Sequence, residues 1–348
     1  MKLPPSLLGL LLCCLHTLPA HAAEIRGAGA TFPSAVYATW ASAYEKEHGG
    51  KVTYQPTGSG DGIKRIVARQ VDFGGSDSPM SATDLDKNQL LQFPTAVGGI
   101  VPVVNLRGVA PDQLQLSGDL LADIFRGAVT QWNDKRIAAL NPGVPLPATA
   151  IVRIVRAERS GTTEAFTKYL AAVSAPWRDG PGVGQQVSWP AATVAVEGND
   201  GVAKALAGTP GAIAYVSHDR VVRHKLAGVR LRNRSGNTVS ASEESFRSAV
   251  HESDLNRKGD ETASLLDQPG SLSWPLTVTT YVLIDARPKT AVAASDALQF
   301  LYWTFLKGDA LVRSSGLTPL PTAIQARMVL RFQKVRPLDG QPLNFYAR

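Results

Sequence analysis

Short apolar runs alternate with amphipathic helical segments along most of the chain. Between residues 34 and 47, Val36, Trp40 and Tyr44 recur every fourth position and a Gly-Gly pair follows, which predicts a helix. The same reasoning predicts helices at 61–70, 162–173, 200–207 and 290–306, a capped helix opening at 81–84, and strands at 51–55, 71–75, 95–106, 151–156, 211–217 and 277–284. This alternation predicts an α/β fold.

Three stretches lack this patterning. The polar segments at 176–190 and 232–240 are predicted to be surface loops, and residues 331–348 a mobile basic tail. The 348 residues leave room for two ordinary domains, each with its own core. No internal repeat is visible.

The first 23 residues have the pattern of a secretory signal peptide. Lys2 supplies a positive start, 7–15 is apolar but too short to span a bilayer, and Ala20 and Ala22 suit a signal peptidase. We therefore predict cleavage after Ala22 or Ala23 and a soluble, exported, periplasmic protein. Removing Lys2, the only charged residue of this segment, lowers the formal net charge from +7 to +6.

Both cysteines of the chain, Cys13 and Cys14, lie in this predicted leader. The mature chain then has no thiol, which excludes disulfides, thiolate metal sites and cysteine redox catalysis. Four histidines remain, and they are scattered without metal-ligand spacing: His48, His218, His224 and His251. The sequence therefore predicts neither a metal nor another cofactor.

Three tight loops rich in Gly, Ser and Thr each lead directly into a predicted helix. They are 27–33 (GAGATFP), 57–62 (TGSGDG) and 160–163 (SGTT). Helix N-termini present free N–H groups and the positive end of the helix dipole, so such loops suit an anion such as phosphate. The alternative for each loop is an ordinary helix cap. Three of them together, with Arg156 close to the third, favour an anion site.

Several motifs, in this order, resemble the PstS-type phosphate-binding proteins of high-affinity phosphate ABC transporters. The main ones are GAGATFP at 27–33, VDFGGSDSP at 71–79 and RAERSGT at 156–162. Further matches lie at 92–95, Trp132, 198–201, 210–213 and 274–275. The resemblance covers nearly the whole mature chain.

The resemblance implies a two-lobed type II periplasmic binding-protein fold, in which two mixed-sheet α/β lobes flank a hinge and a ligand cleft. We expect lobe 1 to comprise 24–105 and 276–348, and lobe 2 to comprise 106–275. The family's phosphate ligands fall on Thr31, Phe32, Ser59, Asp77, Arg156, Ser160, Gly161 and Thr162. The implied partners are inorganic phosphate and the permease subunits of an inner-membrane ABC transporter, with the binding protein itself a monomer.

The chemistry of two of these residues is readily understood. Arg156 can donate two N–H groups to an oxyanion. Asp77 suits an anion that carries a proton, because an ionised carboxylate accepts a hydrogen bond from phosphate O–H. Sulfate has no such proton at neutral pH and would leave a buried carboxylate unpaired, at a cost of ~1–3 kcal/mol or more. The alternative is that Asp77 only caps the turn before Pro79.

Three positions depart from the family pattern. Asp61 adds a carboxylate to the second loop, where Lys64 or Arg65 could pair with it. Glu158 could form a salt bridge with Arg156. Arg159 either adds positive potential or is simply solvated.

The leading hypothesis is phosphate capture for a membrane permease. A same-fold binder of another oxyanion is the first alternative: Asp77 argues against sulfate and molybdate but not against arsenate. A signalling or extracellular paralogue is a second. An exported phosphatase would need a metal cluster or an activated nucleophile, which the sequence lacks. Nucleic-acid binding is disfavoured because basic residues are interspersed with acidic ones.

Overall fold

The computed structural model describes residues 24–346, so the predicted signal peptide at 1–23 lies outside the described part of the chain. The strands are β1 (Glu24–Gly29), β2 (Lys51–Gln55), β3 (Phe73–Ser76), β4 (Leu90–Val104), β5 (Gln115–Leu116), β6 (Val152–Arg156), β7 (Thr193–Val196), β8 (Ala212–Ser217), β9 (Ala227–Gly228), β10 (Arg230–Arg232), β11 (Thr238–Val239) and β12 (Thr277–Asp285). The helices are α1 (Ser34–His48), α2 (Ser59–Val67), α3 (Ala82–Lys87), α4 (Gly118–Phe125), α5 (Lys135–Leu140), α6 (Gly161–Val173), α7 (Ala175–Arg178), α8 (Gly198–Gly208), α9 (His218–His224), α10 (Glu243–Glu252), α11 (Asp254–Arg257), α12 (Ala291–Lys307), α13 (Asp309–Ser314) and α14 (Thr322–Phe332).

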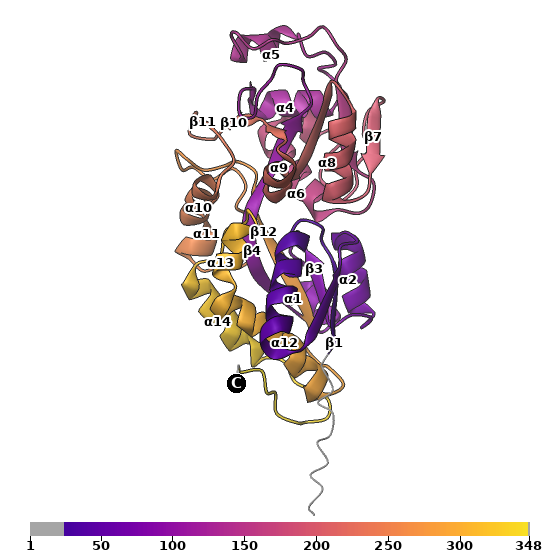
Figure 1. The fold of residues 1–348 in the computed structure, drawn as a ribbon, viewed down its shortest axis with the longest axis vertical. Coiled ribbons are helices and arrows are strands. Elements are labelled where there is room, and N and C mark those ends of the chain that lie inside the picture. Colours follow the sequence, from indigo (N-terminus) through magenta and orange to yellow (C-terminus); the bar gives the residue numbers. More distant parts are fainter. Residues whose placement is uncertain (1–23, 347–348) are drawn as a thin grey trace, which may run out of the picture.

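One long strand, β4, connects the two lobes (Figure 1). The main sheet has the order β2-β1-β3-β12-β4-β8-β6-β7, and β9 also pairs with β4. The first part of β4, up to Gly99, pairs with β12, whereas Ile100–Val104 pair with β8. Lobe 1 is thus built around β1, β2, β3 and β12, and lobe 2 around β6, β7 and β8.

Both lobes contain mixed sheets. In lobe 1, β1 is parallel to β2 and β3, and β12 runs antiparallel to β3 and β4. In lobe 2, β6 is parallel to β7 and β8, and β8 is antiparallel to β4. The predicted two-lobed α/β fold is therefore confirmed.

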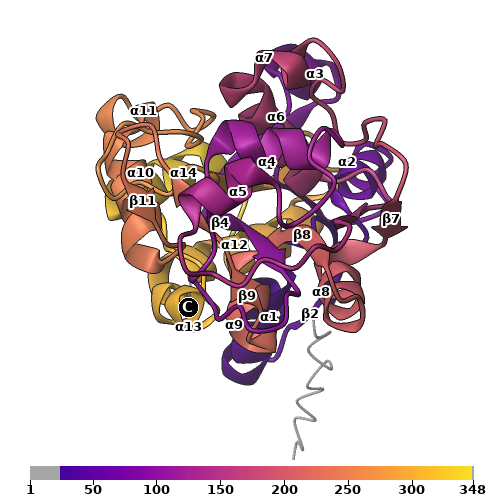
Figure 2. The same ribbon diagram turned by 90° about the horizontal axis from the view of Figure 1, so that it is seen from above.

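Helices cover the sheets through apolar stripes, as the sequence pattern predicted. In α1, Val36, Trp40 and Tyr44 are all buried, and Gly49 ends the helix in the left-handed conformation with φ 74°. Seen along the long axis of the molecule, α10, α11 and α14 gather on one side, and α2, α8 and β7 lie on the other (Figure 2). None of the helices between residues 24 and 346 combines the length and apolar character that a bilayer crossing needs.

The structure differs from the predicted elements in several places. β4 begins at Leu90 rather than at residue 95, and α2 spans Ser59–Val67 rather than 61–70. The predicted loops contain α7 and β11. Six strands and eight helices within residues 24–346 were not predicted, most of them short. Among them is β1, half of whose residues are Gly or Ala, which carry little strand signal.

The predicted mobile tail is wrong for the residues that the structure describes. Val335 and Phe345 are buried against the lobe 1 core, and the Asn344 N–H donates to Ser295 Oγ at 2.9 Å. A few apolar side chains spaced along a basic segment suffice to dock it, although its overall composition resembles that of a free terminus.

Glycines let α2 lie directly on the strands of lobe 1. A Cβ at Gly62 would lie 2.6 Å from Gly29 Cα and 2.6 Å from the Gly75 carbonyl oxygen. The neighbours are backbone atoms, which cannot swing aside as a side chain could. This close packing holds the first turn of α2, with Ser59, beside the end of β3.

We predict that Gly62→Ala lowers the free energy of unfolding by about 1–3 kcal/mol, because the added methyl group must push α2 away from the sheet. Gly208→Ala is the matched control. Gly208 is exposed at the end of α8 and has no heavy atom within 4 Å of an added Cβ, so that variant should be neutral or more stable by up to ~1 kcal/mol. Urea unfolding followed by circular dichroism measures both, and equal midpoints would contradict the packing argument.

Candidate functional site

The predicted site residues lie where strands of the two lobes end and helices begin. Thr31 and Phe32 connect β1 to α1, Ser59 opens α2, and Asp77 directly follows β3. Arg156 ends β6 in the other lobe, and Ser160, Gly161 and Thr162 surround the start of α6. All eight residues are buried. In open α/β sheets the carboxyl ends of strands are the usual place for ligands.

Asp77 lies at the centre of the contacts between the lobes. Its backbone N–H donates to Ser59 Oγ at 3.2 Å within lobe 1. Its carboxylate accepts from Thr162 Oγ1 of lobe 2 at 3.1 Å and from Thr280 Oγ1 of β12 at 2.9 Å. Burial raises the pKa of Asp77 from 3.8 to about 6, against the hydrogen bond from Thr280, the charge of Arg156 and the hydrogen bond from Thr162. The carboxylate is therefore ionised at neutral pH and retains unused lone pairs.

Arg156 combines a buried positive charge with an unused donor. Its Nε donates to Glu158 Oε1 at 2.9 Å, and Nη2 bonds to the same oxygen. Nη1 is buried and has no hydrogen-bond partner among the described residues. A buried guanidinium nitrogen without an acceptor is costly, so this atom suits an additional anionic group.

Thr31 is held from the opposite lobe by Asn199, the second residue of α8. Asn199 Nδ2 donates to Thr31 Oγ1 at 2.9 Å, and the Asn199 backbone N–H donates to the same oxygen at 3.3 Å. Asn199 Oδ1 accepts from the Ser217 N–H, which fixes the orientation of the amide group. Because two donors already occupy the Thr31 oxygen, its own O–H is left to donate.

The start of α6 supplies neutral donors. Ser160 caps the helix by accepting from the Thr163 N–H at 3.2 Å. The next two amides, of Gly161 and Thr162, have no acceptor within the helix. A Cβ at Gly161 would lie 2.6 Å from Ser59 Oγ and 2.9 Å from Asp77 Cβ, so only glycine permits this approach between the lobes.

The three departures from the family pattern have clear partners. Asp61 forms a 2.6 Å ion pair with Arg65 and accepts from Thr57 Oγ1 at 2.6 Å, so its charge is paired, whereas Lys64 takes no part. Glu158 pairs with Arg156, as expected. Arg159 is exposed, and its backbone oxygen accepts from the Gly60 N–H at 3.2 Å across the two lobes.

Sequence reasoning missed two residues of this site. Thr280 lies in an apolar strand whose pattern gave no sign of a polar role, and only its register places it near Asp77. Asn199 belongs to the motif at 198–201, and an amide at a predicted helix start was a usable signal. Both act through a side chain that is distant in sequence, and a local pattern does not show which one.

The polar groups of the site suit an anion. Across residues 24–346, no group of three or more His, Asp or Glu side chains is placed to hold a metal ion. The unused groups are hydroxyl, amide and guanidinium donors together with one carboxylate acceptor. That set fits a small oxyanion carrying at least one proton.

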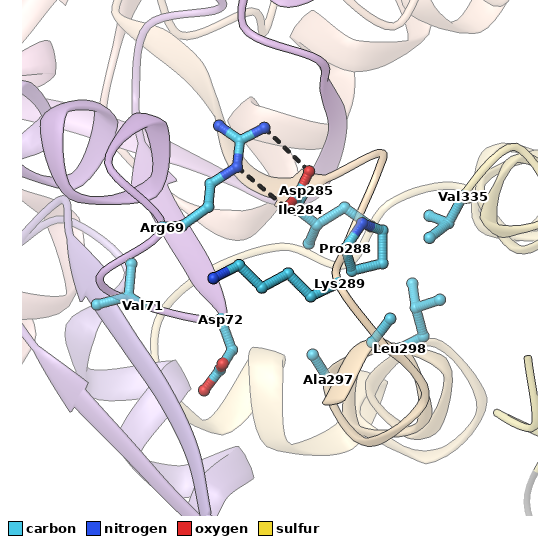
Figure 3. Close-up of a pocket in the computed structure, with 11 residues that line it drawn as sticks. Arg69, Val71, Asp72, Ile284, Asp285, Pro288, Lys289, Ala297, Leu298 and Val335 are labelled. Atoms are coloured by element: carbon cyan, nitrogen blue, oxygen red, sulfur yellow. Dashed lines mark hydrogen bonds and ion pairs between the residues drawn. The ribbon is translucent and has the colours of Figure 1, made fainter. Parts of the chain in front are cut away.

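A cavity of about 220 Å³ lies in lobe 1, lined by other residues than those of the candidate site (Figure 3). Apolar side chains such as Ile284 and Leu298 line it. Two of its charged groups pair with each other, since Arg69 binds both oxygens of Asp285 at 3.0 Å; Asp72 and Lys289 also line it. Its largely apolar lining distinguishes it from the polar groups gathered around Asp77.

Comparisons with known proteins agree with this description. A family model described as "PBP superfamily domain" matches residues 16–307. The chain is 41% identical over 311 residues to "Phosphate-binding protein PstS" of Haemophilus influenzae, covering 89% of this chain and 93% of the relative. It is 32% identical over 310 residues to a protein of the same name from Methanocaldococcus jannaschii, covering 82% and 79%.

Solved structures share the fold at lower identity. A periplasmic phosphate-binding protein (PfluDING) bound with phosphate superposes with a TM-score of 0.69 and 24% identity, covering 88% of this chain and 92% of that one. A phosphate-binding protein from Stenotrophomonas maltophilia superposes with a TM-score of 0.68 and 20% identity, covering 89% and 94%. With the family model and the PstS relatives spanning most of its length, the chain belongs to the PBP superfamily and, within it, to the PstS-type phosphate-binding proteins.

Proposed function

We propose that this protein is a periplasmic solute-binding protein that captures inorganic phosphate and delivers it to an ABC transporter permease. One observation carries the proposal: a buried, ionised acceptor, Asp77, lies beside a buried cation, Arg156, that has a free donor. The names of the PstS relatives and the solved fold neighbours support the same ligand.

The proposed phosphate site uses all eight residues named from the sequence. Arg156 Nη1, the Thr31 and Ser59 hydroxyls and the amides of Phe32, Gly161 and Thr162 donate to phosphate oxygens, and Ser160 orders the start of α6. The ionised Asp77 carboxylate accepts a hydrogen bond from the phosphate O–H. Neutral donors suffice for most of the oxygens, so the site needs only one arginine.

We also propose the lobe limits given above, 24–105 with 276–348 and 106–275, and hinge motion where the chain crosses between them. The pairing of β4 first with β12 and then with β8 supports a crossing within that strand. In this proposal Thr31–Asn199 and Asp77–Thr162 are contacts of the closed form.

Export and assembly complete the proposal. A cleaved leader at 1–23 directs the chain to the periplasm, where it acts as a monomer and as a carrier rather than an enzyme. It requires no cofactor and no nucleic acid. The permease receives phosphate when the lobes reopen.

We predict that calorimetry at pH 8 shows phosphate binding tighter than sulfate binding by roughly 10- to 100-fold or more. Sulfate has no O–H group from which the Asp77 carboxylate could accept a hydrogen bond. Below about pH 6 Asp77 is protonated and can donate to sulfate, so the preference should narrow by roughly tenfold at pH 5. Equal affinities at pH 8 would overturn the proposed function.

We predict that Arg156→Ala weakens phosphate binding on the order of 100-fold or more, because it removes the buried donor and leaves the negative charge of Glu158 without its cationic partner. Arg159→Ala is the control: its side chain is exposed, so the loss should stay within about threefold. Isothermal titration calorimetry measures the phosphate affinity of both variants. Comparable losses of affinity would mean that Arg156 is not the guanidinium that binds phosphate.

We predict that phosphate makes the wild-type protein more compact in X-ray scattering and that Gly161→Ala loses this response, with affinity reduced about tenfold or more. The added methyl group would meet Ser59 and Asp77 across the closing lobes. Gly201→Ala in α8, where the nearest heavy atom to an added Cβ is 3.9 Å away, should close normally. Full compaction of Gly161→Ala would argue against closure through this contact.

A further inference from the structure

β12 carries a buried hydroxyl whose geometry is tied to Asp77. Thr280 has 0% of its surface exposed, and its Oγ1 donates to Asp77 Oδ1 at 2.9 Å. β12 runs antiparallel to β3 with Tyr281 opposite Ser76, so the next pair along the ladder is Thr280 and Asp77. Side chains of such directly opposed residues lie close enough to bond.

An irregularity in the sheet fixes the backbone at this position. Along β4, Thr280 faces Ala96 but Tyr281 faces Pro94, so Thr95 is an extra residue in the ladder. The Thr95 hydroxyl donates to the Thr280 carbonyl at 3.3 Å and shares a 2.9 Å hydrogen bond with the Tyr37 hydroxyl. β-Bulges next to functional sites commonly re-aim side chains, and this one anchors the strand that presents Thr280.

The two oxygens of Asp77 are held from different lobes. Thr162 reaches Oδ2 from α6 in lobe 2, so this contact depends on how close the lobes are. Thr280 reaches Oδ1 from within the same sheet as β3, so its contact is independent of closure. Thr280 can therefore orient the carboxylate before any ligand arrives.

The other groups around Asp77 do not duplicate this role. Arg156 is the positive charge that acts on it, and Tyr37 and Tyr54 face it from α1 and β2. Burial raises the pKa of both tyrosines, so they are neutral. Glu164, Lys168 and Tyr281 line a small cavity that Asp77 borders. Among the influences that lower the Asp77 pKa, the Thr280 hydrogen bond is the largest.

We propose that Thr280 is a specificity-determining positioning residue, which holds Asp77 as a hydrogen-bond acceptor and so restricts the site to oxyanions that carry a proton. The proposal rests on the proposed phosphate function and deepens it. In this proposal Thr280 does not contact phosphate itself and acts through Asp77.

The test compares Thr280→Val, which keeps the shape and removes the hydroxyl, with wild type. Phosphate and sulfate affinities are measured by calorimetry between pH 5 and 9. Without the Thr280 hydrogen bond, Asp77 should become protonated at a higher pH. We therefore expect the pH at which the preference for phosphate over sulfate narrows to rise by about one unit, and that preference at pH 7 to fall roughly tenfold. An unchanged pH profile in Thr280→Val would overturn the proposal.

Thr279→Val is the matched control in the same strand. The Thr279 hydroxyl is buried and has no hydrogen-bond partner among the described residues. The phosphate and sulfate affinities of Thr279→Val should therefore depend on pH as those of the wild type do. Thr280→Ser keeps the hydroxyl and should restore the wild-type profile. If both Val variants shift alike, or if Ser does not restore the profile, the effect is structural and the proposal fails.

Two further outcomes are distinguishable. Wild-type protein that binds no phosphate at all would overturn the proposed function itself. If Thr280→Val does not fold, Thr280→Ala removes the same hydroxyl and leaves a smaller side chain. The pH dependence of its phosphate and sulfate affinities, compared with that of Thr280→Ser, then decides the question.

Discussion

The site is organised around the burial of one carboxylate. Removing Asp77 from water disfavours its charged form, and the fold offsets this cost with hydroxyl donors from both lobes and a nearby guanidinium. A buried carboxylate held in this way repels an anion unless that anion brings a proton. In the proposed function, the same group that is expensive to bury supplies the basis for choosing between otherwise similar tetrahedral ions.

Close approach of backbone to backbone is the second requirement. Gly62 lets α2 rest on β1 and β3, and Gly161 lets the start of α6 reach Ser59 and Asp77. These contacts leave no space for a methyl group, so the donors converge from opposite lobes without long side chains. Short, rigid donors lose little conformational entropy when they bind, unlike flexible lysines.

The positive net charge plays a lesser part than composition alone suggests. Within the site, Glu158 accepts two bonds from Arg156, and beside it Asp61 is paired with Arg65, so much of the local charge is neutralised. In the proposed function, recognition then rests on the direction of the donors and of one acceptor rather than on the amount of charge. Diffuse basic residues can steer anions towards the protein but do not choose among them.

Local patterns in the sequence determined the α/β class, six of the twelve strands and six of the fourteen helices among residues 24–346. They also located the loops that bear Thr31, Ser59 and Ser160, because periodicity and helix-start chemistry are properties of neighbouring residues. They did not show that the 331–348 segment docks, since burial of Val335 and Phe345 depends on distant core partners. Nor could they place Thr280 or Asn199. A β-bulge at Thr95 and the meeting of two lobes decide those contacts, and both depend on residues far apart in the chain.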